Sequence, residues 1–542
     1  MPAPPPESAV PSEPLASPLA PLKVPAFRML WFTWLAANIS MWMNDVAAAW
    51  MMSSLTTTPI WVALVQTAST LPVFLLGLPS GALADILNRK RFLLFTQIWI
   101  LFVALLLYVA VLTDLMSPVM LLALTFANGV GLALRWPVFA AIIPELVPRA
   151  QLPAALALNG ISMNASRIIG PLVAGAVIAS LGSAYVFLLN AMLAVLAAVI
   201  VSRWQHQPPL QPLGRERLFS AMRVGVQYVG RSAHLQGVLV RISLFFFHST
   251  ALLALLPLVA RGLHGGSAGT YTLLLSSMGA GAIVAALWLP RLRRGWSRDG
   301  MVARGALLQS SAMVVVAFAP SAWWAAPAMF AAGMAWITTA NSLSVSAQLG
   351  LPSWVRARGM SMFQMSIMGA SAMGAAIWGQ VATLASVQTS LLIAAATGVA
   401  SILTVNHLMV DTSVEEDLTP SQKFKAPVVD APPESGQVLS TIEYHIDPAR
   451  AKEFRELMQM SRRNRLRHGA LSWELLRDVS DSGRFIEQIV DASWAEHLRR
   501  FERVTATDAE LRDRKLAFHI SESPPVVTRC VMESTIRAKE PT

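Results

Sequence analysis

The chain has 542 residues, of which 54% are hydrophobic and only 13% are charged, and its formal net charge is +11. Soluble proteins carry about 25% charged residues, so this composition argues against a soluble protein of this length. The single cysteine, Cys530, excludes an intrachain disulfide and a cysteine-based metal site. The sequence contains no phosphate-binding loop and no metal-ligating cluster, so we expect no metal, no cofactor and no ATP-driven pumping.

The first 24 residues are rich in proline and alanine. They lack the basic segment and the apolar core of a signal peptide. We expect residues 1–24 to form a disordered cytoplasmic tail.

Residues 25–410 contain the apolar stretches, each close to the length that crosses about 30 Å of hydrocarbon. The sequence predicts spans at 30–52, 60–83, 92–113, 118–142, 155–180, 184–204, 236–260, 270–290, 301–320, 323–347, 359–384 and 387–410. The predicted fold is therefore an all-α membrane protein with twelve transmembrane helices. Its two six-helix halves, 25–205 and 235–410, are joined by a central cytoplasmic loop, 206–234.

Lysine and arginine are distributed unequally between the predicted loops. Residues 89–91, the central loop and residues 291–298 are rich in them, whereas the loops on the other side contain only Arg261. Positive residues mark cytoplasmic loops. We therefore expect both termini in the cytoplasm and the chain in the inner membrane. The same asymmetry explains the positive charge without nucleic acid.

The two halves resemble one another at an offset of about 205 residues. "ELVPRAQLPAALAL" before the fifth span has a counterpart in "GLPSWVRARGMSM" before the eleventh. Repeated halves of this kind place a substrate path at their interface, near the middle of the bilayer.

A linker rich in proline and charge, residues 411–437, separates the spans from a different kind of sequence. Residues 438–534 alternate between strand and helix patterns in the order βαββαβ, with the hairpin turn "DSG" between the two middle strands. This order predicts an α+β ferredoxin-like cytoplasmic domain.

The polar stretch "SGALADILNRKR" after the second span resembles the loop signature of the major facilitator superfamily. It supplies Gly81, Leu83, Ala84, Asp85, Arg89 and Lys90 in register, but has Ile86 for an arginine and Asn88 for a glycine. The resemblance implies that Asp85 latches the outward-facing state through basic partners, although the missing arginine weakens this charge relay. Asparagine can adopt the left-handed turn that glycine allows. The alternative is an ordinary basic cytoplasmic loop.

The fifth span contains "RIIGPLVAGA", with Gly170, Pro171 and Gly175. It is similar to the motif of superfamily antiporters, although Ala174 replaces one glycine. Small residues allow helices to approach closely. Together with "AFRMLW" at the first span, these segments resemble the secretion-type exporters that include the enterobactin exporter.

The C-terminal domain resembles the antibiotic biosynthesis monooxygenase-like ferredoxin folds, through "HGALSWELLRD" and the segment after it. Such domains commonly pair their sheets, which implies a homodimer. The candidate pocket residues are His468, Trp473, His497 and His519. Because nothing joins them into a catalytic set, we interpret the domain as a regulatory or dimerising appendage.

Charged residues inside the predicted spans are the candidates for function. Asp45 is the one carboxylate well within a span, and Arg135 and Arg167 are its candidate partners. We expect these three residues to couple transport to protons, with either arginine pairing with Asp45; a static ion pair is the alternative. The further polar residues assigned to a substrate cavity are Asn38, Asn44, Asn128, Asn164, His248, Asn341 and Gln364.

These observations predict a secondary transporter, not an enzyme, embedded in the lipid bilayer. We expect it to export a small amphipathic metabolite, drug or siderophore-like compound by proton antiport with alternating access. One alternative is a nutrient importer of the same fold. Another is a membrane-tethered sensor or enzyme that acts through its C-terminal domain.

Overall fold

The structure is a computed structural model that describes residues 19–204, 218–292, 298–352, 354–409 and 436–533, with Asp417–Thr419, Ser421, Pro427 and Val429 from the linker. The predicted N-terminal tail and most of the linker lie outside the described residues.

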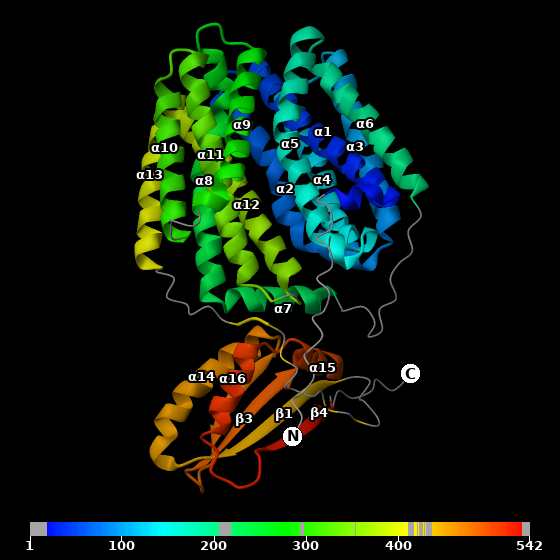
Figure 1. Ribbon diagram of the computed structural model, residues 1–542. Coiled ribbons are helices and arrows are strands. Elements are labelled where there is room, and N and C mark those ends of the chain that lie inside the picture. The colour runs from blue at the N-terminus through cyan, green and yellow to red at the C-terminus, as the bar shows by residue number, and fades with distance from the viewer. Residues whose placement is uncertain are drawn as a thin grey trace, which may run out of the picture. The chain divides into compact units, whose positions relative to one another are not determined.

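The first half of the described chain consists of long helices that begin and end at short connections (Figure 1). They are α1 (Pro25–Leu55), α2 (Pro59–Ile86), α3 (Arg89–Leu112), α4 (Pro118–Leu146), α5 (Leu152–Ser180) and α6 (Ser183–Arg203). Proline opens α1, α2 and α4, where its missing N–H costs no hydrogen bond. The Ser117 hydroxyl caps α4 by accepting from the backbone N–H of Met120.

The second half follows the same plan. Its long helices are α8 (Ala233–Gly262), α9 (Ala268–Leu292), α10 (Arg298–Phe318), α11 (Ala322–Leu349), α12 (Arg356–Leu384) and α13 (Val387–Leu408). Ten helices in the described part are long and apolar enough to cross a membrane, and α1 and α11 are not among them. The chain is thus a multi-pass membrane protein, while a count of twelve spans stays a prediction.

A short helix, α7 (Leu218–Gly230), lies within the predicted central loop, residues 206–234. Val224, Tyr228 and Val229 are buried, and residues between them, such as Val226, are exposed. Such an amphipathic helix is too short to be detected as a span.

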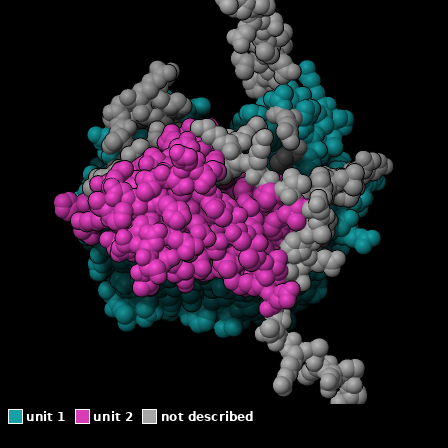
Figure 2. Space-filling model, turned by 90° about the horizontal axis from the view of Figure 1, so that it is seen from below, with its two compact units in different colours: residues 1–213, 243–340, 365–403 teal, residues 214–242, 341–364, 404–542 magenta. Residues whose placement is uncertain are grey.

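Residues fall into two compact units, which Figure 2 shows in teal and magenta. The first comprises 1–213, 243–340 and 365–403, and so contains most of both helical halves. The second comprises 214–242, 341–364 and 404–542.

The largest core of the first unit is shared by both halves. It includes Met52 of α1, Leu255 of α8 and Leu274 of α9, all fully buried. Near it the N–H of Ile60 in α2 donates to Thr383 Oγ1 of α12 over 2.9 Å. The halves are therefore closed against each other at the end of the bundle that carries the α1–α2 connection, residues 56–58, here called the α1–α2 end.

The second unit contains a four-stranded antiparallel sheet in the order β2-β3-β1-β4. Its strands are β1 (Gln437–His445), β2 (Ser472–Arg477), β3 (Arg484–Asp491) and β4 (Val526–Met532), and its helices are α14 (Ala451–Arg467), α15 (Trp494–Glu502) and α16 (Ala506–Leu516). The hairpin predicted around "DSG" forms between β2 and β3. The predicted second helix is divided into α15 and α16, because Thr505 starts a new helix with a capping box to Asp508.

The candidate functional site

Asp45 lies on α1 without an ion pair among the described residues, and its Oδ1 is buried without a hydrogen-bond partner. The expected pair with Arg135 or Arg167 is not formed in this structure. Asp45 lies within electrostatic range of Tyr271 of α9. Because α1 belongs to the first half and α9 to the second, this carboxyl group lies where the halves meet.

Arg135 of α4 lies among aromatic rings. Its guanidinium carbon is 5.2 Å from the centroid of Trp34, and Trp34 stacks on Phe139 at 3.9 Å. Nη2 makes a long contact of 3.5 Å with the carbonyl oxygen of Ala37, and Nε is buried without a partner. Cation–π attraction therefore replaces the predicted carboxylate.

Arg167 of α5 is placed in the same way. Its guanidinium carbon is 5.3 Å from the ring centroid of Trp42 in α1 and 5.1 Å from that of Trp336 in α11. Nη1 is buried without a hydrogen-bond partner in the described part of the chain. Arg167 thus contacts both halves of the helical bundle.

The predicted asparagines divide into two groups. Asn38 and Asn44 of α1 are buried with side-chain atoms that have no partner among the described residues, and Asn128 is buried in α4. Asn164 instead donates to the carbonyl oxygen of Gly160 one turn earlier, over 3.0 Å. Asn38 and Asn44 therefore retain unused hydrogen-bonding capacity, whereas the side-chain N–H of Asn164 is satisfied within its own helix.

The predicted polar residues of the second half are scattered. His248 of α8 bonds through Nδ1 to the carbonyl oxygen of Leu244 over 2.8 Å, and its ring lies beside Trp378. This is the environment of a satisfied buried histidine. Asn341 of α11 and Gln364 of α12 are half-buried and belong to the second unit.

The loop motif after α2 is described in part. Gly81 and Asp85 lie in the last turns of α2, but their side chains are outside the described residues. Arg89, at the start of α3, forms an ion pair with Glu145 at the end of α4, while Lys90 is half-buried next to it. The motif therefore joins α3 to α4 at the end of the bundle that carries the α2–α3 connection.

Asn88 corrects one expectation. Its φ is −64° and ψ is 112°, so it does not adopt the left-handed turn. Its side-chain oxygen instead accepts from the backbone N–H of Arg91 over 3.2 Å and caps α3. Asparagine has a capping side chain that glycine lacks, and capping decides the conformation here.

The glycines of the α5 motif allow close helix contacts, as the sequence predicts. A Cβ at Gly170 would collide with Trp42 of α1, and one at Gly175 with Thr272 of α9. Pro171 is buried within α5. Through these contacts α5 packs against α1 on one side and against α9 on the other.

A cluster at the α1–α2 end joins α1 to α8 and α9. The guanidinium carbon of Arg261 lies 4.3 Å from the ring centroid of Trp50, and its Nε donates to Ser53 Oγ over 2.8 Å. Trp50 also stacks on Tyr271, with centroids 6.0 Å apart and an interplanar angle of 17°. We call Trp50, Ser53, Arg261 and Tyr271 the α1–α2 latch.

A separate cavity of about 590 Å³ lies between α10 and α11. Its lining is apolar apart from Ser311 and includes the exposed rings of Trp323 and Trp324. None of the charged residues described above lines it, so we do not assign transport to this cavity.

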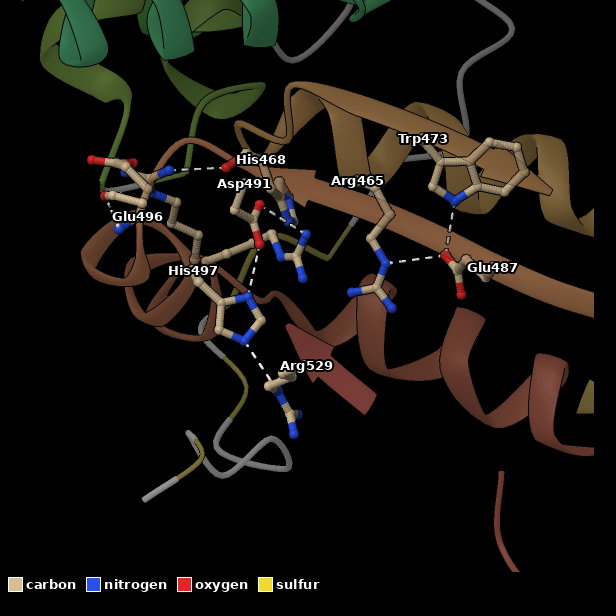
Figure 3. A network of polar contacts seen from close by, with 11 residues as sticks. Arg465, His468, Trp473, Glu487, Asp491, Glu496, His497 and Arg529 are labelled. Atoms are coloured by element: carbon tan, nitrogen blue, oxygen red, sulfur yellow. Dashed lines mark hydrogen bonds and ion pairs between the residues drawn. The ribbon is translucent and has the colours of Figure 1, made fainter. Parts of the chain in front are cut away.

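The C-terminal domain contains a buried polar network (Figure 3). Glu487 of β3 is fully buried and lies among five polar groups, from Tyr444, Ser461, Arg465, Trp473 and Lys515, at 2.9 to 3.4 Å. Burial alone would raise the pKa of Glu487, but Lys515 and Arg465 outweigh it and hold the pKa far below its usual value. Glu487 is therefore an ionised structural group.

A second part of the network surrounds Asp491. Its carboxylate accepts from His497 Nδ1 at 2.7 Å and Arg500 Nη1 at 3.1 Å, and Arg529 Nε donates to His497 Nε2 at 3.2 Å (Figure 3). Burial again opposes ionisation, but the bond from His497 and the charge of Arg500 lower the pKa of Asp491. Of the histidines predicted to line a pocket, His497 and His468 are thus structural members of the core, and Trp473 is a bond donor to Glu487.

His519 lies at the C-terminal end of β1, where its Nδ1 accepts from the backbone N–H of His445 over 3.0 Å. Ile446 and His519 also form an isolated bridge. The structure therefore does not bring the four predicted pocket residues together into one site.

Trp354, between α11 and α12, is enclosed by residues of the second unit. The centroid of its ring is 5.5 Å from that of Tyr228 of α7 and 5.9 Å from that of His468, both in edge-on geometry. The guanidinium carbon of Arg503 lies 4.9 Å from the same centroid. Arg503 Nη1 donates to the carbonyl oxygen of His468 over 2.9 Å. The C-terminal domain is thus docked on α7 and the α11–α12 segment.

The aromatic partners of the membrane arginines are not evident from the sequence. Trp34, Trp42, Trp50 and Trp336 occur in apolar runs where a tryptophan is unremarkable. The available signal was the number of arginines within spans, which exceeds that of carboxylates and so requires another kind of partner.

The sequence matches the transmembrane secretion effector family over residues 16–537. The staphyloferrin A transporter of Staphylococcus aureus is 21% identical over 280 residues, which are 51% of this chain and 70% of that protein. An uncharacterised MFS-type transporter of Bacillus subtilis, YfiS, is 29% identical over 178 residues, which are 32% of this chain and 41% of that protein.

Solved transporter structures share the fold. A nucleoside transporter, NupG, superposes with a TM-score of 0.60 at 12% identity, covering 70% of this chain and 99% of that one. A POT family transporter superposes with a TM-score of 0.57 at 13% identity, covering 71% and 96%. The family and the fold of the present chain imply a small-molecule substrate. Its apolar helices imply that it lies in a lipid bilayer. The chain belongs to the transmembrane secretion effector family and is a membrane transporter of the major facilitator type.

Proposed function

We propose that this transporter exports a small amphipathic metabolite, drug or siderophore-like compound across the inner membrane in exchange for protons. Both termini and the C-terminal domain are cytoplasmic in this proposal, and α1 and α11 complete twelve spans in two halves. The basic residues around α2–α3 and in the central loop support this orientation. The likeness to the secretion-type exporters, including the enterobactin exporter, supports the direction. The staphyloferrin A transporter among the relatives supports a siderophore-like substrate.

One observation carries the proton-coupling part of the proposal. Asp45 is a carboxylic acid within a predicted span, at the junction of α1 and α9, without an ion pair among the described residues. An isolated carboxylate is costly in hydrocarbon, and binding a proton removes that cost. In this proposal Asp45 is protonated while the α1–α2 end is closed and ionises when that end opens to water. The charges of Arg135 and Arg167 influence the equilibrium between the protonated and ionised forms of Asp45.

The first test uses inverted membrane vesicles with an imposed proton gradient and a panel of fluorescent drugs and catecholate and carboxylate siderophores. We expect the wild type to accumulate at least one compound, and Asp45→Asn to lose gradient-dependent accumulation because its amide cannot carry the proton. Asp114→Asn is the matched control, since Asp114 lies in the α3–α4 connection with φ 54°, a conformation that asparagine also adopts. Equal accumulation by wild type and Asp45→Asn would remove Asp45 from the coupling mechanism. Substrate-driven uptake in the opposite direction would favour a nutrient importer.

We also propose that the C-terminal domain is a ferredoxin-like appendage that pairs with a second copy through the face of its sheet opposite α14. Leu439, Val490 and Cys530 lie in one cross-strand row of that face and are half-buried or exposed. The bonded state of Glu487 and Asp491 supports a structural interior and not a catalytic pocket.

Cys530 provides the test of pairing, because it is the single cysteine of the chain. Copper-phenanthroline oxidation of membranes joins two thiols as a disulfide, and we expect it to produce a covalent dimer of the wild type. Cys530→Ser is the control and should give none. A chain that stays monomeric after oxidation, and also after amine crosslinking of Cys530→Ser, would contradict the pairing.

A further inference from the structure

We propose that Arg167 is the anion-recognition residue of the substrate site, so that the transported compound carries a carboxylate or catecholate oxygen beside a planar or apolar body. This inference rests on the proposed transport of a small amphipathic compound and names its chemical class. It also adds Trp42 and Trp336 to the site.

Arg167 lies where helices of both halves converge. Trp42 of α1 and Trp336 of α11 flank its guanidinium, and a Cβ added at Gly279 of α9 would lie 3.6 Å from the carbonyl oxygen of Arg167. Substrates of transporters built from two repeats bind at the interface of the repeats. Arg167 therefore occupies the expected place for a group that contacts the substrate.

The two indole rings leave the hydrogen-bonding capacity of Arg167 unused. Cation–π contact attracts the charge, but a ring face accepts no conventional N–H bond, and a guanidinium carries five N–H donors. Nη1 is buried and has no hydrogen-bond partner in the described part of the chain. A buried donor without an acceptor is costly, so this position calls for a ligand oxygen.

Among the described spans, no carboxylate serves as a counter-ion for Arg167. Glu145 pairs with Arg89, and Asp45 contacts neither Arg135 nor Arg167. A planar guanidinium binds carboxylates with two parallel bonds, and vicinal anionic oxygens offer similar acceptors. An anionic substrate would complete the site, and the flanking rings would stack against its planar or apolar body.

The alternative is that Arg167 is only a wedge between two tryptophans. Equilibrium binding separates the two interpretations, using the full chain in lipid nanodiscs and ligand pairs that each consist of an acid anion and its neutral derivative. The pairs are 2,3-dihydroxybenzoate with 2,3-dihydroxybenzamide, and citrate with its trimethyl ester. We expect at least one anion to bind about tenfold or more tighter than its neutral partner, a difference of about 1.4 kcal/mol.

Arg167→Gln should remove this preference, and Arg167→Lys should keep part of it, because lysine retains the charge but not the paired donors. Arg241→Gln is the matched control, since Arg241 is another arginine within a long helix and is buried, but it donates to Asn406 Oδ1 over 2.9 Å. It should keep the preference even if the protein is less stable. Equal binding of every anion and its neutral partner, or an unchanged preference in Arg167→Gln, would overturn the inference. The assay needs no proton gradient, so its outcome is independent of the Asp45 experiment.

Discussion

Glu487→Gln is expected to lower the free energy of unfolding of the C-terminal domain by about 3–5 kcal/mol, the cost of removing one partner from a buried ion pair. The substitution removes the carboxylate that contacts both the buried Lys515 and the partly exposed Arg465, whose side chain is 23% exposed. Hydrogen exchange of β1 and β3 in the full-length chain measures the loss, because the core strands exchange through global opening of the domain.

Glu443→Gln is the control for this substitution. Glu443 pairs with Arg484 at 2.7 Å, but both side chains are about one third exposed, at 27% and 34%. Exposed pairs contribute about 0–1 kcal/mol. Equal losses in the two variants would show that the Glu487 network does not stabilise the domain as its burial implies.

Acidification should also lower the free energy of unfolding of the C-terminal domain. The pKa of Glu487 is lower in the folded chain than its ordinary value of 4.5, so its contribution is present above that pH and is lost as the pH falls. Burial also lowers the pKa of His468 to about 4 from 6.5, so the unfolded chain binds this proton more readily. Exchange protection, corrected for intrinsic rates, should therefore decline between about pH 6.5 and 4, and His468→Gln should remove the earlier part of that decline.

Trp50→Leu is expected to open the α1–α2 end of the transporter. It removes the stacking of Trp50 on Tyr271 and the cation–π contact with Arg261, each worth about 0.7 kcal/mol. Both contacts join α1 to helices of the second half, so their loss favours a conformation in which the halves separate at this end. The expected shift is about tenfold in the ratio of open to closed states.

Cysteine labelling measures this shift. Cys530→Ser gives a cysteine-free background, into which Ala47→Cys is introduced at a fully buried position of α1. An impermeant maleimide added from the side of the α1–α2 connection should label it about tenfold faster in Trp50→Leu. Trp323→Leu is the control, because Trp323 is 88% exposed and lies outside the latch. Identical rates in both variants would exclude a latch at Trp50.

The spans and the C-terminal strands could be predicted because they depend on local patterns of hydropathy. The α7 helix was missed because its amphipathic pattern covers only 13 residues. In β3 the alternation places Glu487 in the same buried row as Phe485 and Ile489, so that signal was present in the sequence.

The contacts of the charged residues could not be predicted in this way. Arg167 and Trp336 are 169 positions apart, and a composition rich in tryptophan does not indicate which ring meets which arginine. Asp45 lacked its expected arginine because tertiary packing placed aromatic rings beside both candidates. Helices are specified locally, whereas partners across the bundle depend on the packing of the whole chain.

The enclosure of Trp354 also has a consequence for the order of biosynthesis. The ribosome completes α7 and the α11–α12 segment long before it reaches His468 and Arg503, so Tyr228 and Trp354 remain uncovered until the last part of the chain has emerged and folded. A chain truncated before residue 436 would retain that aromatic surface permanently. We therefore expect a cell's proteases to degrade such a truncated chain faster than the 542-residue chain.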